Sequence, residues 1–122
     1  MKNKLLFPAL LVFILMFCFV FLSCNNPSGG NITHTVMFLI TGPQTTAYRV
    51  MYSNETDNYD QITDVPIPWE KTITVQGRKN ISCSAIFLSN TSTYTAKIFV
   101  DGQEKYSSSS SSGSVAVSGV TQ

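Results

Sequence analysis

Residues 94–102 read Tyr-Thr-Ala-Lys-Ile-Phe-Val-Asp-Gly, and this stretch decides the fold class of the chain. Apolar side chains occupy every second position, as expected for a strand with one buried face: Tyr94, Ala96, Ile98 and Val100. The Asp101-Gly102 pair that follows suits a two-residue type I′ hairpin, because both positions tolerate positive φ. We therefore expect a strand, a tight turn and a partner strand over residues 103–107.

The same signals recur in both directions along the chain. Segments rich in β-branched and aromatic residues are separated by Gly, Pro, Asn and Ser turns. They cover residues 35–41, 45–53, 59–65, 69–75, 81–87 and 115–117. Strands spaced by roughly 10–12 residues predict an all-β fold, a small immunoglobulin-like antiparallel β-sandwich of about seven to eight strands. It covers residues 33–122 and follows an N-terminal signal helix. A small β-barrel is the alternative.

Several packing details can also be predicted. Trp69 is expected to be the large central residue of the core. Alternation in residues 45–53 places Tyr48, Val50 and Tyr52 on one face and Arg49 on the other. The apolar parity of residues 81–87 predicts a buried face that includes a cysteine.

The hairpin register can be predicted from its turn. A two-residue loop would place Phe99 opposite Glu104 and Lys97 opposite Tyr106. Each pair joins an aromatic residue to a charged one, so the pairing does not decide which face of the second strand points to the core. The low-complexity serine run at residues 107–112 is expected to be a mobile loop.

The first 24 residues have the layout of an export signal. A basic start is followed by eighteen uncharged residues, 5–22, and by Ser23-Cys24. The end of this stretch, Phe21-Leu22-Ser23-Cys24, resembles the lipobox of bacterial lipoproteins. It predicts residues 1–23 as a lipoprotein signal peptide and Cys24 as the lipid-attachment residue, carrying acyl chains such as palmitate. Cys18 is the weaker candidate, because the bulky Phe17 precedes it. An uncleaved membrane helix and secretion without lipid are the alternatives.

Residues 24–32 are expected to form a flexible tether to one small domain. Residues 25–31 span only about 25 Å when extended, so the domain stays near the membrane. Two of the eight basic residues, Lys2 and Lys4, leave with the signal, so six basic residues face seven acidic ones. The mature net charge of −1 and the absence of a basic stripe argue against nucleic acid as a partner. Only Cys83 is left without lipid, so no internal disulfide is expected.

The sequence offers few groups for catalysis or metal binding. The single histidine, His34, and Cys83 form one formal pair, but a cysteine on an apolar strand face is usually inert. Acidic residues gather only in residues 55–64, where weak calcium coordination competes with the simpler interpretation of a solvated loop. No phosphate-binding glycine loop or catalytic triad motif occurs, so we predict neither an enzyme nor a cofactor. Five aromatic residues suggest either a sugar-stacking surface or, more simply, core packing: Tyr48, Tyr52, Tyr59, Trp69 and Tyr94.

Residues 65–75 read Val-Pro-Ile-Pro-Trp-Glu-Lys-Thr-Ile-Thr-Val, which resembles the V-x-L-P-W-x-K-T segment of MmpS-type proteins. Residues 36–42 and 47–52 are similar to the opening of that family. Residues 96–102 and 114–118 are similar to its late hairpin and its closing strand. The resemblance covers nearly all of residues 33–120. It differs in two respects: a lipobox replaces the usual membrane helix, and Ala96 and the 118–119 region stand where relatives carry a cysteine pair.

The resemblance implies a β-sandwich held outside the membrane as an accessory to an exporter. The family's best-known members assist MmpL-type transporters of the resistance–nodulation–division class, which export lipids and siderophores. We therefore expect a lipid-anchored cell-envelope protein on the periplasmic face or the cell surface. It would act by protein–protein contact, with an exporter or another envelope protein as partner. An independent extracytoplasmic module that binds a ligand or glycan is the alternative.

Overall fold

A computed structural model describes residues 32–89 and 91–122, and within them the chain is all β. It contains eight strands in two antiparallel four-stranded sheets, as the strand spacing predicted. The first sheet has the order β4-β1-β6-β7 and the second the order β3-β2-β5-β8. The bounds of the first sheet's strands are β1 Thr33–Thr41, β4 Trp69–Gln76, β6 Tyr94–Val100 and β7 Gln103–Ser110. Those of the second are β2 Thr46–Ser53, β3 Tyr59–Pro66, β5 Asn80–Ile86 and β8 Ser114–Val120.

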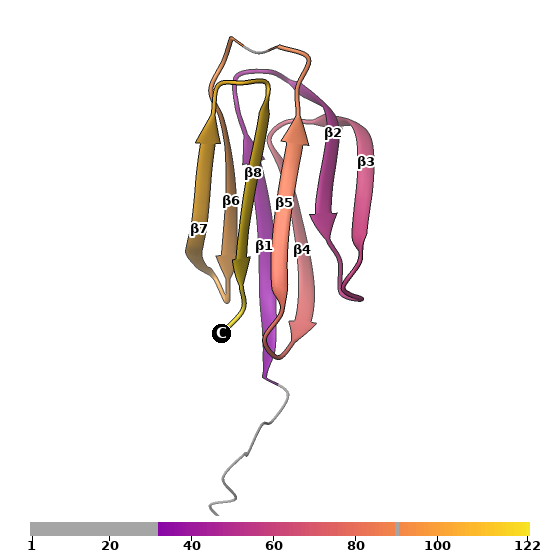
Figure 1. Cartoon of the computed structure of the whole chain (residues 1–122), viewed down its shortest axis with the longest axis vertical. Helices are drawn as coiled ribbons and strands as arrows, with labels where there is room; N and C mark the ends of the chain where they lie inside the picture. The colour runs from indigo at the N-terminus through magenta and orange to yellow at the C-terminus, as the bar shows by residue number, and fades with distance from the viewer. Residues whose placement is uncertain (1–31, 90) are drawn as a thin grey trace, which may run out of the picture. The chain divides into compact units, whose positions relative to one another are not determined.

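The chain passes repeatedly between the sheets. Only the β2–β3 and β6–β7 connections are hairpins within one sheet, and the other connections cross from one sheet to the other (Figure 1). The N-terminus of β1 lies at one end of the sandwich, which we call the tether end. That end also carries the turns at residues 54–58, 77–79 and 101–102 and the C-terminal residues 121–122. The opposite end, the far end, carries the loop residues 42–45, 67–68, 87–89, 91–93 and 111–113.

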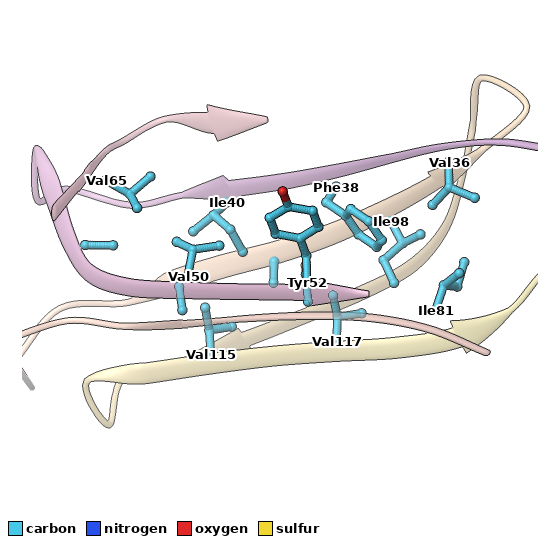
Figure 2. Packing of buried hydrophobic residues seen from close by; sticks show 14 of the residues in the cluster. Val36, Phe38, Ile40, Val50, Tyr52, Val65, Ile81, Ile98, Val115 and Val117 are labelled. Atoms are coloured by element: carbon cyan, nitrogen blue, oxygen red, sulfur yellow. The ribbon is translucent and has the colours of Figure 1, made fainter. Parts of the chain in front are cut away.

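The core lies between the two sheets. Figure 2 shows Val36, Phe38 and Ile40 of β1 pointing toward the side chains of β2 and β8 in the other sheet. The predicted alternation of β5 and β6 is confirmed: the apolar residues on their inward-facing sides are at most 5% exposed. They are Ile81, Cys83 and Ala85 with the adjacent Phe87, and Tyr94, Ala96, Ile98 and Val100. Burial of this continuous apolar layer is the main stabilising contribution.

The β6–β7 hairpin has the predicted turn but not the predicted register throughout. Asp101 and Gly102 have φ values of 51° and 81°, as a type I′ turn requires. Phe99 lies opposite Glu104 as predicted, but Tyr106 lies opposite Ile98, so the predicted Lys97–Tyr106 pair is wrong. A bulge next to Phe99 inserts one residue and turns the Tyr106 side chain toward the core.

The serine run is not a loop. β7 continues to Ser110, which pairs with Tyr94, and only residues 111–113 turn toward β8. Backbone pairing with β6 extends the strand regardless of side-chain polarity, because each serine still supplies its N–H and C=O groups. The hydroxyls of Thr95 and Ser109 lie 2.9 Å apart across the two strands and add a hydrogen bond.

Two predicted side-chain positions are also wrong. Trp69 is only partly buried, since it is the first residue of an edge strand and nothing encloses its outer side. Tyr94 and Phe38 are instead the largest fully buried side chains. Tyr48 is 51% exposed rather than on the face of Val50 and Tyr52. The reason is a break in the alternation of β2, where Ala47 and Val50 are both fully buried although they are three positions apart.

Candidate functional site

The predicted lipid-attachment residue, Cys24, lies outside the described residues. So do the predicted signal peptide, residues 1–23, and all of the predicted tether except Ile32. Within residues 32–89 and 91–122 there is no helix of sufficient length and apolar character to cross a bilayer. The candidate sites described below therefore belong to the β-sandwich domain alone.

His34 and Cys83 have separate structural roles. His34 is 5% exposed, and its Nδ1 lies 2.8 Å from Oδ2 of Asp101, while the backbone N–H of Thr35 donates to Oδ1 of the same carboxylate at 2.9 Å. These contacts fasten the β6–β7 turn to the start of β1. The hydrogen bond with His34 is the main reason why the pKa of Asp101 lies below its usual value. Burial raises the pKa of Cys83 to about 12, so its thiol stays protonated and unreactive at neutral pH.

The acidic residues at positions 55–64 lie in the turn at residues 54–58 and on the solvent-exposed part of strand β3. Oδ1 of Asn54 accepts hydrogen bonds from the backbone N–H groups of Thr56 and Asn58, at 3.0 and 3.1 Å. Asp57 forms an ion pair with Lys79, and Asp60 accepts a hydrogen bond from Nδ2 of Asn54 at 3.0 Å. The carboxylates thus engage different partners. Among the described residues, no three His, Cys, Asp or Glu side chains come together as a metal site.

The five aromatic candidates divide into buried and exposed groups. Tyr52 and Tyr94 belong to the core, and Trp69 packs against Tyr52 with ring centroids 5.4 Å apart. Tyr48 and Tyr59 are exposed by 51% and 61%. They lie toward opposite ends of the β2–β3 hairpin, because Ser53 pairs with Tyr59 and is five residues from Tyr48. The alternative of a Tyr–Trp stacking surface is therefore not assembled from these residues, and core packing, the simpler interpretation, describes Tyr52 and Tyr94.

The far end has a different chemical character from the rest of the surface. Its loops contain no Asp, Glu, Lys or Arg, and Leu88 is 87% exposed there. Leu88 and Tyr48 line an open cleft of about 400 Å³ together with Pro43 and Asp64. An exposed leucine beside a half-exposed tyrosine is the most conspicuous apolar feature of the described surface. The alternation of residues 81–87 predicts that the Leu88 side chain points to solvent. The alternation of residues 45–53 does not predict the exposure of Tyr48.

The outer face of the first sheet carries a second, better covered apolar group. Met37 of β1 lies directly opposite Phe99 of β6, and both point away from the core and are partly buried. The adjacent Lys97 forms an ion pair of 2.9 Å with Glu104. The aliphatic stems of such long side chains can shield apolar neighbours from water. This group is therefore weaker evidence for a contact surface than the far end.

Comparison with known proteins adds no assignment. No protein-family model matches this chain, and no curated protein matches its sequence.

Proposed function

We propose that this chain is a bacterial lipoprotein of the cell envelope. In this proposal residues 1–23 are removed, Cys24 becomes the acylated N-terminus, and the β-sandwich is held outside the membrane by acyl chains. The basic start, the apolar stretch and the Ser23-Cys24 junction support it. Acyl anchoring is strong enough for this role, because each buried methylene contributes about 0.8 kcal/mol.

We further propose that the domain acts by contact with another envelope protein. One observation carries this proposal: the far end is free of charged residues in its loops and exposes Leu88 and Tyr48. The anchor would be joined to β1 at the tether end, so the far end would be turned away from the point of attachment. Apolar and aromatic side chains at an exposed site are typical of protein contacts.

An exporter of the resistance–nodulation–division class is the partner that the MmpS resemblance suggests. That resemblance rests only on the sequence patterns at residues 36–42, 47–52, 65–75, 96–102 and 114–118. No family model matches the chain. Any other envelope protein with an apolar surface of matching shape would serve the same proposal. The His34–Asp101 contact and the buried Cys83 have structural explanations, so they supply no reason to propose a reaction.

Site-specific photo-crosslinking in intact cells tests the contact. A photoreactive amino acid at position 88 of the lipidated chain should yield one dominant crosslink to an envelope or integral membrane protein. The same amino acid at position 62, on edge strand β3, is the matched control, because Ile62 is also exposed (38%) but lies in a strand rather than a far-end loop. Equal crosslinking from both positions, or none from position 88, would contradict a specific contact at the far end.

A further inference from the structure

The four edge strands of the sandwich differ in how they are protected. Exposed sheet edges attract other strands, and proteins usually protect them with charges, proline or bulges. β3 carries Asp60, Asp64 and Pro66, β4 carries Glu70 and Lys71, and β7 carries Glu104, Lys105 and a bulge. β8 has none of these features, and the chain contains no Asp, Glu, Lys, Arg or Pro from residue 106 to residue 122. β8 is therefore the unprotected edge.

The register of β8 identifies its free backbone groups. The N–H of Phe87 donates to the carbonyl of Gly113 at 2.7 Å, and the N–H of Thr121 donates to the carbonyl of Lys79 at 3.0 Å. Both pairs continue the β5–β8 register. Since hydrogen-bonded pairs alternate along an antiparallel ladder, the odd-numbered residues of this strand bond to β5. The even-numbered residues direct their N–H and C=O groups to the free edge.

Tyr106 closes one end of this free edge. Its hydroxyl donates to the carbonyl of Val120 at 2.8 Å and accepts from the N–H of Val120 at 3.1 Å. Gly119 makes room for the ring, because a Cβ there would lie 2.1 Å from a ring carbon of Tyr106. Three residues with outward backbone groups remain: Ser114, Ala116 and Ser118.

We propose that two copies of this domain pair edge to edge through β8, antiparallel, about a twofold axis at Ala116. This register places Ala116 opposite Ala116 of the second copy and Ser114 opposite Ser118, so every outward group of the three residues finds a partner. If one copy is shifted along the other by two residues in one direction, Ser118 loses its partner in the strand. A shift in the other direction requires the backbone groups of Val120, which are already hydrogen-bonded to the hydroxyl of Tyr106. The site is thus self-complementary in register, as an isologous contact requires.

The side chains of β8 agree with this register. Val115 and Val117 are buried on the core side. In the dimer, Val115 of each copy would lie opposite Val117 of the other copy, so the apolar layer would continue across the axis. The side chains on the outer face, Ser114, Ala116 and Ser118, are small, exposed and uncharged. Like charges opposite one another destabilise a strand pair, and here there are none to do so. The inference concerns the domain alone and does not depend on the lipid anchor or on a far-end partner.

Cysteine trapping in the full-length chain tests the register. Ala116→Cys places two cysteines at the axis, where a hydrogen-bonded pair has Cα atoms about 5.5 Å apart, within disulfide reach. Ser118→Cys is the matched control, because its two copies would lie about 13 Å apart along the strands. We expect about tenfold more disulfide dimer from Ala116→Cys than from Ser118→Cys. The double variant Ser114→Cys/Ser118→Cys should also form a dimer. The unsubstituted chain, with its native cysteines, gives the background.

A charge placed at the axis provides a second, independent test. Ala116→Lys, added to the double cysteine variant, sets two positive charges opposite each other and should lower the dimer fraction about fivefold. Thr72→Lys adds the same charge on the exposed face of β4 and should leave the dimer fraction unchanged. Similar trapping at positions 116 and 118, trapping of a different protein at position 116, or no dimer above background would overturn the proposal.

Discussion

The two ends of the sandwich are stabilised in different ways. At the tether end, polar groups are satisfied within the domain: Thr121 is fully buried, and its hydroxyl donates to the carbonyl of Gly77 and accepts from the N–H of Lys79, both at 2.8 Å. At the far end, aromatic packing dominates: the rings of Phe87 and Tyr94 stack with centroids 3.6 Å apart, and Gly42 lies against Tyr94. The polar groups of the tether end are thus satisfied within the domain, whereas the far end exposes Leu88 and Tyr48, the side chains that we propose as a contact surface.

The largest expected effect tests the close packing of the far end. A Cβ on Gly42 would lie 2.2 Å from a ring carbon of Tyr94. Gly42→Ala should therefore lower the free energy of unfolding by about 3 kcal/mol through overpacking. Gly77→Ala is the tether-end comparison: a Cβ there meets nothing within 4 Å, and only its φ of 68° opposes a side chain. That strain should cost about 1 kcal/mol. Urea unfolding of both variants measures the difference, and equal losses would contradict the account.

The polar bonds of the tether end predict the next largest effect. Thr121→Val keeps the shape of the side chain but leaves the N–H of Lys79 and the carbonyl of Gly77 without their partner. We expect the free energy of unfolding to fall by about 2 kcal/mol. Thr121→Ser retains the hydroxyl and should lose clearly less. If valine proves as stable as serine in urea unfolding, these hydrogen bonds do not hold the C-terminus.

The tether end should also contribute a pH dependence. Hydrogen bonds from His34 and the backbone N–H of Thr35 lower the pKa of Asp101 below its ordinary value of 3.8. A lowered folded-state pKa stabilises the fold above the unfolded-state pKa, and this stability is lost as the pH falls through the folded-state pKa. Asp101→Asn removes that contribution. The stability gap between the wild-type chain and the variant, measured by urea unfolding from pH 6 to pH 2, should shrink below about pH 4. A gap that is constant with pH would refute this role for Asp101.

The smallest expected effect on stability concerns the exposed residues of the far end. Leu88→Ser should change the free energy of unfolding by less than about 0.5 kcal/mol, because the side chain is 87% exposed. It should nevertheless reduce co-purification with the envelope partner. Ile62→Ser, on β3, is the control and should retain the partner. If both variants lose the partner, or if neither does, the far end is not a specific contact surface.

The sequence was sufficient for the fold class because its strongest signals are local. The alternation of residues 81–87 and 94–100 and the Asp101-Gly102 turn depend on neighbours in the chain, and the structure confirms them. The position of Tyr106 was not predictable, because a single-residue bulge reverses the parity of a strand without a distinct local pattern. The position of Trp69 was predicted wrongly for another reason: its size suggested the centre of the core, but its place at the start of an edge strand leaves it only partly buried.

The candidate site was harder to predict than the fold. Leu88 and Tyr48 come together only because β2 and the loop after β5 meet at the far end, which depends on contacts distant in sequence. The pairing of the serine run with β6 was not predictable either. A high serine content suggests a loop, but the backbone N–H and C=O groups that form a strand are present in every one of these residues. The predicted anchor residue, Cys24, depends on a processing signal rather than on the fold, and it stays a prediction.

Mass spectrometry of the mature N-terminus tests the central claim most directly. The chain, purified from membranes of cells that express it from Met1, should begin at Cys24 and carry the added mass of acyl chains. Cys18→Ser should give the same N-terminal species, whereas Cys24→Ser should give an unlipidated chain that is either released or retained as precursor. A mature chain that keeps residues 1–23, or one whose Cys24 bears no lipid, would contradict the account.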